Sequence, residues 1–287
     1  MGNANPNRVD RGDTQGDTRG AQTANRATPH EAIDGAANYG LEREHWWYQG
    51  LRDVLTRVLM RPQYKALRGG RVLDAGCGSG ENLRLLRDLL APRYLGGFDL
   101  SPRAVAHARA TLPGADIYAG DLCCPDIHVE ELDLVLCCDV CTAAAGSSAK
   151  IRGACRTGLG RLRQRLRPGG LLVLHEPAGA WLYSGHDVAV GNRQRFSAGQ
   201  LGRLLHDLDL KVEFLSYRVC TLLPVIVAAR LPSLLRLPAA CEATSDVRPC
   251  ARPLNRALAA LLAVENRLLA AGWRWPWGSS LLAVGRA

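Results

Sequence analysis

Short apolar runs recur along this chain of 287 residues and are separated by stretches with helical spacing. The runs lie at 71–75, 94–98, 115–118, 132–138, 170–175, 210–217 and 280–286. Strands buried on both faces have continuous apolar sequences, and their alternation with helices is typical of a parallel sheet wound on both sides. The sequence therefore predicts an α/β fold, a doubly wound sheet of seven strands.

Helix starts support this order of elements. Ser101 is a candidate N-cap because Pro102, at the first helical position, tolerates the missing amide hydrogen. Ser197 and Gln200 have the spacing of a capping box. Before the first strand, the apolar residues of 42–60 recur at helical spacing, which predicts one amphipathic helix there.

Four parts are expected along the chain. Residues 1–40 are rich in Gly, Asn, Thr, Asp and Arg and are expected to form a disordered tail. Residues 41–219 form the core, residues 220–278 a mainly helical insertion, and residues 279–287 the final strand. The insertion has more apolar residues than a solvent-exposed loop needs, so we expect a cap. It could pack on the sheet, line an apolar pocket or lie at a membrane interface.

The folded part carries the positive charge of the chain. The formal net charge is +9, and nearly all cations are arginines, since lysine occurs only at Lys65, Lys150 and Lys211. The arginines are scattered along helices, which favours solvated helix faces, although an anionic ligand, an acidic membrane surface or nucleic acid would also reward such charge. No uninterrupted apolar run reaches membrane-spanning length, so a soluble protein is expected.

The ten cysteines are interpreted as thiols. No signal-peptide-like segment precedes them, which favours a reducing compartment, the cytoplasm. Cys138 and Cys141 form a CxxC pair, but no second pair stands at zinc-ribbon spacing. Cysteine packs well in buried strands, so we predict no metal.

A glycine-rich turn follows the first predicted strand. The segment VLDAGCGSGENL (72–83) contains Asp74-x-Gly76-x-Gly78-x-Gly80 at a strand-to-helix junction. Glycines there permit a tight turn and let a ligand approach the backbone. A dinucleotide fingerprint would need glycine at the position of Glu81, so a dehydrogenase is excluded at that residue.

Two further carboxylates follow the next strands. Asp99 stands nineteen residues after Gly80, where a carboxylate can accept hydrogen bonds from both hydroxyls of a ribose. Asp121, in AGDL, follows the third strand and is placed for the amine of an adenine. The order of these groups predicts a nucleoside-binding site at the carboxyl edge of the sheet.

The run from Val72 to His175 resembles the class I S-adenosylmethionine (SAM)-dependent methyltransferases. The likeness rests on DAGCGSG, FDLSP, GDL, LDLVLCCDV and LRPGGLLVL. It implies a Rossmann-like fold and an enzyme that uses SAM as methyl donor and releases S-adenosylhomocysteine. SAM carries an ammonium and a sulfonium in place of phosphates, so Asp74 would attract this ligand.

The resemblance implies a set of cofactor-binding residues. In it, the helix before the first strand covers the pocket, and Arg52 reaches the carboxylate of SAM. The expected residues are Trp47, Arg52, Asp74, Ala75, Gly76, Cys77, Gly78, Gly80, Asn82, Asp99, Leu100, Asp121, Leu122 and Cys138.

A narrower likeness concerns the acceptor. EHWWYQGLR, EPAGAWLYSGHD, RQRFSAGQL and WGSSLLAV resemble a bacterial branch associated with surface saccharides or secondary metabolites. That branch commonly has a histidine shortly after the fourth-strand aspartate, whereas this chain reads Asp139-Val140-Cys141-Thr142-Ala143. Asp139 is therefore either a catalytic residue or part of the pocket wall.

The residues after the fifth strand are the candidates for acceptor chemistry, because α/β folds bind ligands at that edge. His186 and Asp187 could form a general base with its orienting carboxylate, or be structural. Arg193 and Arg195 could clamp an anionic acceptor. The expected acceptor-binding residues are His175, Glu176, Trp181, Tyr183, Arg193 and Arg195.

Several functions remain open at this stage. We predict methyl transfer to a small-molecule, saccharide or lipid-linked acceptor, with peripheral membrane contact as an open possibility. A nucleic-acid methyltransferase is disfavoured because the fourth strand ends in CDVC and not in an Asn/Asp-Pro-Pro-aromatic motif. A non-catalytic methyltransferase-like binding partner has the same fold. The sequence leaves the methylated atom and the oligomeric state undetermined.

Overall fold

All seven predicted strands lie in one sheet. The computed structural model describes Met1 and residues 36–142, 148–235 and 245–287. The strand order is β3-β2-β1-β4-β5-β7-β6. The strands are β1 (Arg71–Ala75), β2 (Tyr94–Asp99), β3 (Asp116–Ala119), β4 (Leu132–Cys138), β5 (Leu166–Pro177), β6 (Lys211–Arg218) and β7 (Ser280–Arg286). The predicted seven-stranded α/β fold is confirmed.

The sheet is mixed, because its last strand runs against its neighbours. β1 to β5 pair in parallel. β7 is antiparallel to both β5 and β6. The strand order reverses between β1 and β4, and the crevice outside the carboxyl ends of such strands is where open α/β sheets bind ligands.

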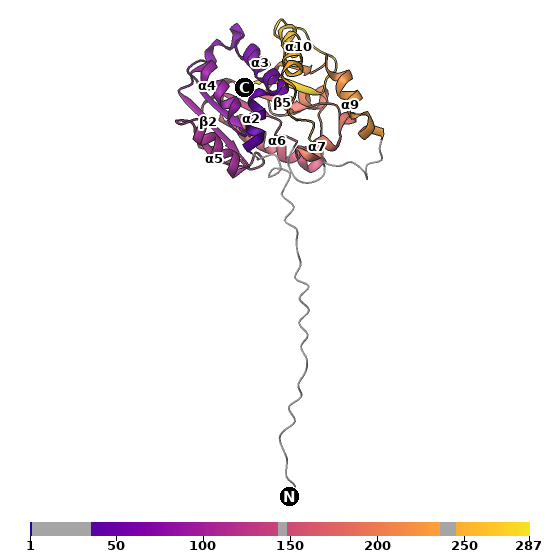
Figure 1. Cartoon of the computed structure of the whole chain (residues 1–287). Coiled ribbons are helices and arrows are strands. Elements are labelled where there is room, and N and C mark those ends of the chain that lie inside the picture. The colour runs from indigo at the N-terminus through magenta and orange to yellow at the C-terminus, as the bar shows by residue number, and fades with distance from the viewer. Residues whose placement is uncertain (2–35, 143–147, 236–244) are drawn as a thin grey trace.

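Helices cover both faces of this sheet (Figure 1). The main helices are α2 (Ala36–Glu44), α3 (Trp46–Leu59), α4 (Glu81–Leu90), α5 (Pro102–Thr111), α6 (Ser148–Arg165), α7 (Gly185–Ala189), α8 (Ala198–Asp207), α9 (Leu223–Leu235) and α10 (Arg252–Ala270). Two 3-10 turns are η1 (Pro62–Leu67) and η2 (Ala180–Leu182). The predicted caps at Ser101 and Ser197 are both formed.

Alternate residues of a strand pack into two separate hydrophobic cores, one on each face of the sheet. In β5, Leu172 and Leu174 pack with α6 and α8, whereas Leu171 and Val173 pack with α3 and α4. This two-sided burial explains why the strands are continuously apolar in sequence. The polar side chains that must meet a ligand are therefore left to the strand ends.

The N-terminal prediction needs correction. Residues 2–35 of the predicted tail lie outside the described residues, and α2 begins at Ala36, before the predicted boundary at 40. The predicted helix over 42–60 is two helices. They break at His45, whose Nδ1 accepts the amide hydrogen of Trp47 at 3.3 Å and so caps α3.

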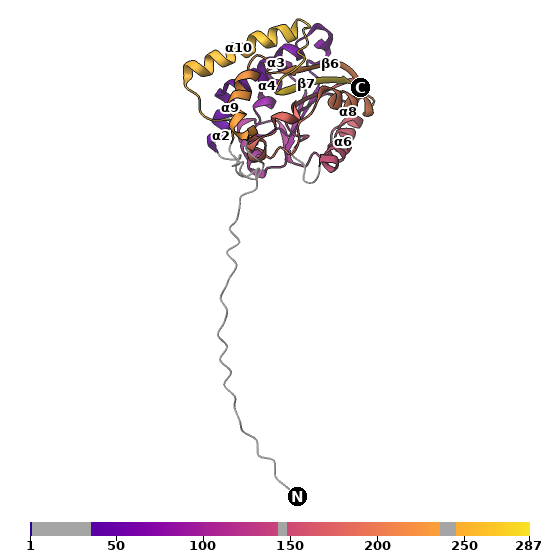
Figure 2. The ribbon, with the colours of Figure 1, turned by 90° about the vertical axis from the view of Figure 1, so that its right-hand side faces the viewer.

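The insertion before β7 has two different neighbours. α10 lies along α3, where the Asn266 amide donates to the Gly50 carbonyl at 2.8 Å and to Asp53 at 2.9 Å (Figure 2). α9 lies against η2 and reaches the pocket described below. Residues 236–244 lie outside the described residues. That 220–278 is a separable cap stays a prediction.

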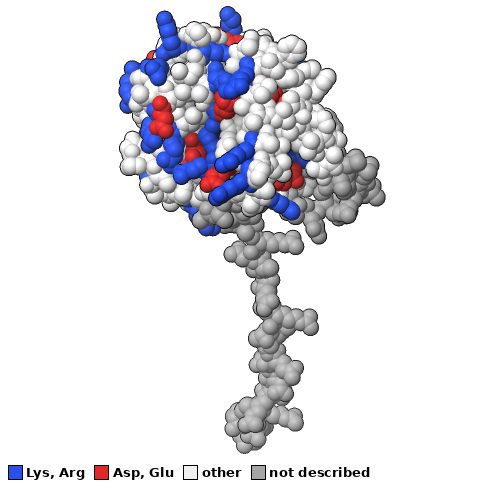
Figure 3. Space-filling model, turned by 45° about the horizontal axis from the view of Figure 1, so that its top comes forward, with Lys and Arg blue, Asp and Glu red and all other residues white. Residues whose placement is uncertain are grey.

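The charged side chains are spread over the surface. Figure 3 shows Lys and Arg in the majority on one face, with Asp and Glu interspersed among them. Such mixing matches the expected solvated helix faces. Among the described helices, none combines the length and apolarity needed to cross a bilayer.

Two helical glycines test the packing of α10 on α3. A Cβ at Gly50 would lie 2.5 Å from Cδ1 of the buried Leu262, whereas a Cβ at Gly153 in α6 would meet nothing within 4 Å. We expect Gly50→Ala to lower the free energy of unfolding by about 1–3 kcal/mol through overpacking. Gly153→Ala should raise it by about 0.4–1 kcal/mol. Urea unfolding of both variants checks this, and a stabilised Gly50→Ala would contradict the close contact.

Candidate active site

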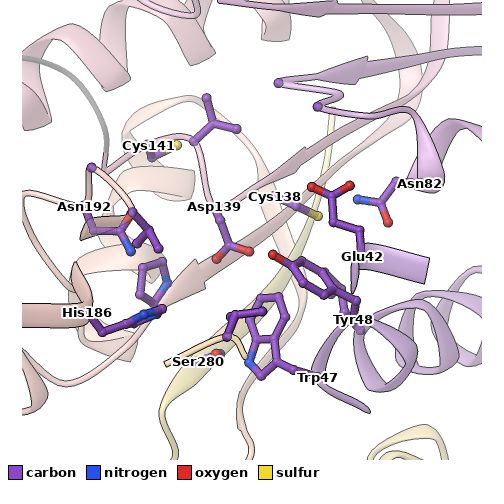
Figure 4. A pocket seen from close by; sticks show the side chains of 18 of the residues that line it. Glu42, Trp47, Tyr48, Asn82, Cys138, Asp139, Cys141, His186, Asn192 and Ser280 are labelled. Atoms are coloured by element: carbon purple, nitrogen blue, oxygen red, sulfur yellow. The ribbon is translucent and has the colours of Figure 1, made fainter. Parts of the chain in front are cut away.

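A pocket of about 1080 Å³ opens at the carboxyl edge of the sheet. The ends of β1, β2 and β4 form its floor, α2 and α3 its near wall, and α9 with the segment 245–248 its far wall. Figure 4 shows Asp139 near the centre of this pocket, with Tyr48 and Trp47 to one side and His186 and Asn192 to the other. One cavity therefore joins the two sets of predicted site residues.

The glycine turn after β1 supplies a bare stretch of backbone. Gly76, Gly78 and Gly80 have φ values of 80°, 52° and 88°, in the left-handed region that favours glycine. A Cβ at Gly76 would lie 2.2 Å from Val140, but one at Gly78 would meet nothing within 4 Å. Gly78 lines the pocket, so its backbone is open to a ligand there.

Two carboxylates border this turn. Asp99 accepts the amide hydrogens of Gly78 and Ser101, both at 2.9 Å, and so links the glycine turn to the end of β2. Asp121 accepts the amide hydrogen of Cys123 at 2.8 Å. Both residues line the pocket, as the nucleoside prediction requires.

Asp74 is buried beneath the turn. Its side chain has no exposed surface, and neither carboxylate oxygen has a hydrogen-bond partner among the described residues. Burial, followed by the charge of Asp99, raises the pKa of Asp74 to about 8. An ionised Asp74 would be stabilised by a cation placed above the turn.

The near wall adds groups that sequence reasoning missed. Glu42 of α2 accepts a hydrogen bond from Ser79, and burial raises the pKa of Glu42 to about 7. Tyr48 also lines the pocket. Arg52 donates to the carbonyls of Glu42 at 2.8 Å and Arg43 at 2.7 Å, so it ties α3 to α2 while it faces the pocket. The sequence predicted one continuous helix from residue 42, so it did not indicate that Glu42 and Tyr48 lie on two helices that both border the pocket.

Comparison with known proteins assigns this arrangement to a family. The model of a methyltransferase domain family matches residues 43–214. The chain belongs to this methyltransferase family. A protein of Mycolicibacterium smegmatis, named a probable S-adenosylmethionine-dependent methyltransferase, is 27% identical over 176 residues. The match spans 61% of this methyltransferase and 63% of that relative, which is less than two thirds of its length.

Solved structures agree on the fold. A chain in the complex between the Haloferax volcanii Trm112 methyltransferase activator and a methyltransferase has a TM-score of 0.56 and 20% identity, covering 89% of this chain and 96% of that one. A SAM-dependent methyltransferase from Thermotoga maritima has a TM-score of 0.52 and 14% identity, covering 89% and 97%. These likenesses support the fold alone.

The glycine turn suits SAM. The buried Asp74 carboxylate needs a cationic partner, and SAM carries an ammonium. Gly78 leaves room for close approach, and Asp99 stands where ribose hydroxyls can donate to it. The residues present therefore fit the cofactor that the family implies.

Most predicted cofactor residues line the pocket. Those that do so are Trp47, Arg52, Gly76, Cys77, Gly78, Asn82, Asp99, Leu100, Asp121, Leu122 and Cys138. Three others lie behind it. Ala75 is fully buried in β1, Gly80 packs near Ala108 of α5, and Asp74 lies under the turn. These three can shape the site or act on its charge, but none of them forms its surface.

Several predicted acceptor residues lie elsewhere. His175 and Glu176 are fully buried, and neither forms part of the pocket surface. Trp181 and Tyr183 are exposed outside the pocket, and the Tyr183 hydroxyl donates to the Asn192 carbonyl at 3.0 Å. None of these four residues lines the pocket, so a direct contact with an acceptor there stays a prediction.

The predicted pairing of His186 with Asp187 is wrong. Asp187 is fully buried and accepts hydrogen bonds from Arg195 and from the amide of Ser184, both at 2.9 Å. Nδ1 of His186 instead accepts the amide hydrogen of Asp246 at 3.0 Å. The ring proton then lies on Nε2, so the neutral ring offers a donor and not a base to the pocket.

The two arginines of the predicted clamp differ. Arg195 is buried, pairs with Asp187 and donates to the carbonyls of Ala178 and Ser279 at 3.0 and 3.3 Å. Nε and Nη1 are therefore used within the protein, although Arg195 also lines the pocket. Arg193 is exposed, lines the pocket and has no side-chain hydrogen bond or ion pair to the described residues. Of the two, Arg193 has the guanidinium that is free of such partners, and the role of both arginines in holding an anion stays a prediction.

The thiols of Cys138 and Cys141 in the CxxC sequence do not face each other. The Cys141 thiol lies 4.0 Å from that of Cys137, on the face of β4 opposite Cys138. The contact with Cys137 and burial hold the pKa of Cys141 well above its usual range. These groups are protonated thiols in an apolar core, as the sequence indicated, and the expectation of no metal cofactor stays a prediction.

We expect Asp99→Ala to weaken SAM binding by about 10- to 150-fold. The ribose hydroxyls would lose a charged acceptor worth ~1.5–3 kcal/mol. Isothermal titration calorimetry with SAM measures the affinity, and circular dichroism checks the fold. Asp88→Ala, an exposed aspartate on α4, is the matched control. Wild-type affinity in Asp99→Ala would contradict the cofactor assignment.

The stability of the ligand-free protein should depend on pH through Asp74. Its pKa rises from an ordinary 3.8 to about 8, so the native state holds a proton that the unfolded state loses above pH ~4. This contribution to stability is complete below pH ~4 and is lost as pH rises toward 8. Asp74→Asn should therefore gain stability relative to the wild type as pH rises. Urea unfolding from pH 4.5 to 8 measures this, and a constant difference would contradict it.

Proposed function

We propose that this SAM-dependent methyltransferase methylates a small-molecule acceptor held between Asp139 and α9. The observation that carries the proposal is one pocket lined by the predicted cofactor residues, by Asp139 and by residues of α9. Methyl transfer needs donor and acceptor in line within one cavity. A cavity that is shared by the cofactor residues and Asp139 supports this proposal.

Asp139 is the candidate base. It follows β4 directly, its side chain is about one-third exposed, and it lines the pocket. Bound SAM supplies an electrophilic methyl group. A hydroxyl or amine acceptor that attacks it must lose a proton, and the carboxylate of Asp139 can receive that proton. His186 cannot do so while its Nδ1 accepts the amide of Asp246.

The walls indicate the kind of acceptor. α9 contributes the apolar side chains of Val225, Ile226 and Ala229, while the exposed Arg193 and Arg248 contribute positive charge. This combination favours a molecule with an apolar body and an anionic group. Such acceptors include phosphorylated or acidic saccharides, lipid-linked sugars and acidic secondary metabolites. The sequence likeness to enzymes of surface-polysaccharide and secondary-metabolite biosynthesis points the same way.

Nucleic acid fits the surface less well. Polynucleotide binding rewards a basic stripe or patch, whereas the basic residues here are interspersed with acidic ones (Figure 3). A non-catalytic binding partner would not need a carboxylate facing the second space. These remain the alternatives that the experiment must separate.

The direct test is product identification. The purified protein is incubated with methyl-labelled SAM and extracts of its source cell, treated or untreated with nuclease, and the labelled product is analysed by mass spectrometry. We expect label in a nuclease-resistant small molecule. Label in nucleic acid would replace the proposal with the first alternative, and SAM binding without any product would favour the second.

Substitution of Asp139 tests the chemistry. Asp139→Asn keeps the shape but removes the proton acceptor, so turnover should fall by ~10²-fold or more. His186→Ala is the matched control in the same pocket. It should change turnover by less than about threefold, because it removes at most one hydrogen bond from a neutral donor, Nε2 of the ring. SAM affinity should be unchanged in both. A larger loss in His186→Ala than in Asp139→Asn would overturn the assignment of the base.

A further inference from the structure

A fully buried arginine lies behind the proposed base. Arg218 ends β6 and has no exposed surface. Nη1 makes its one hydrogen bond to the described residues, to Nε2 of His175 at 2.8 Å, while Nε and Nη2 have no partner among those residues. Burial lowers the pKa of Arg218 to about 10, which leaves it charged at neutral pH. A buried charge is costly, so its position calls for an explanation.

The contact with Arg218 fixes the tautomer of His175. A guanidinium has donors and no acceptor, so Nε2 of His175 must accept and cannot carry a proton. The proton of the neutral ring is then on Nδ1. Nδ1 lies 3.2 Å from Oδ2 of Asp139, so the ring donates to the carboxylate that faces the pocket. Two hydrogen bonds, from Arg218 to His175 and from His175 to Asp139, thus run in one direction toward the pocket.

Asp139 is also held through its backbone. Its amide donates to the His175 carbonyl at 2.7 Å. Its φ of 58° lies in the left-handed region, which is uncommon for a residue other than glycine. Two bonds to the same residue of β5 therefore hold Asp139 in a conformation that turns its carboxylate into the pocket.

The surroundings of the ring oppose its protonation. Burial lowers the pKa of His175, and the charge of Arg218 lowers it further, whereas Asp139 raises it. The Trp47 ring of α3 lies 5.6 Å away at 68°. Glu265 of α10, itself buried, is the negative group that raises the pKa of Arg218 most. A neutral ring can orient Asp139 without removing its negative charge.

We propose that Arg218 and His175 are positioning residues for Asp139. Arg218 keeps the His175 ring neutral with its proton on Nδ1, and that ring aims the Asp139 carboxylate at the acceptor. If the ring became an imidazolium, Asp139 would be locked in an ion pair and would be a weaker base. This inference rests on the proposed role of Asp139, but it gives a positioning role to two residues that lie outside the pocket surface.

Nitrogen-15 NMR of the wild-type protein tests the tautomer without any acceptor. The chain has seven histidines, and comparison with His175→Gln assigns the signals of His175. We expect a protonated Nδ1 and a bare Nε2 that stay unchanged between pH 5.5 and 8. A proton on Nε2, or an imidazolium in this range, would overturn the inference.

Variants of Arg218 test the cause. In Arg218→Met we expect the His175 signals to titrate within pH 5.5–8, whereas Arg218→Lys should restore the neutral ring because it keeps a charged donor. Arg61→Met is the matched control, since Arg61 stacks on Phe214 of the same strand but donates to the carbonyl of Leu269 and not to His175. Titration in the control, or its absence in Arg218→Met, would overturn the role of Arg218. If Arg218→Met does not fold, the wild-type spectrum and Arg218→Lys still decide.

Kinetic measurements test whether these hydrogen bonds affect turnover. Once the acceptor is identified, Arg218→Met should lower kcat by about tenfold at pH 6.5 with little change in KM, and most of the loss should be recovered at pH 8.5. A loss of kcat that is equal at both pH values would show a merely structural role and overturn the inference. A fully active Asp139→Asn would instead refute the proposed function, while the tautomer result would stand on its own.

Discussion

The parallel pairing of β1 to β5 is the constraint from which the site follows. Parallel neighbours cannot be joined by a hairpin, so each connection crosses a face of the sheet and every strand ends at the same edge. Because both faces are then covered, the strand interiors are mainly apolar, and polar groups gather where the strands end. Asp99 ends β2, and Asp121 and Asp139 follow β3 and β4. Their proximity in space is a consequence of the topology.

Burial sets the charge of other carboxylates around the pocket. Asp74 and Glu42 have raised pKa values near the glycine turn, where a cationic ligand would stabilise their ionised forms. On the other side of the pocket, the buried Asp187 already has a partner in Arg195. The buried Glu176 has one oxygen without a partner among the described residues, and burial raises its pKa to about 8. A cationic ligand would therefore stabilise ionised Asp74 and Glu42, whereas the charge of Asp187 is balanced within the protein.

The sequence predicted what depends on local pattern. The strands at 71–75, 132–138 and 280–286 have the predicted bounds, because burial on both faces makes most residues of each strand apolar. The turn at Gly76–Gly80 was found because only glycine tolerates its backbone angles. What failed depends on contacts between distant residues. Nothing near His186 in the sequence indicates that its ring binds residue 246, or that Arg218 would lie behind His175.

The insertion before β7 shows how stability and specificity can reside in one segment. α10 covers α3 through Leu262 and Asn266, so its apolar residues belong to the core that supports the cofactor wall. α9 contributes Val225 and Ile226 to the pocket lining, and Ile226 also packs against the cluster that contains Leu262. Under the proposed function, changes in α9 would alter the choice of acceptor, whereas changes in α10 reach the position of α3 and, through Trp47, the ring of His175. The apolar composition of this segment thus has two physical causes, packing against α3 and lining of the pocket.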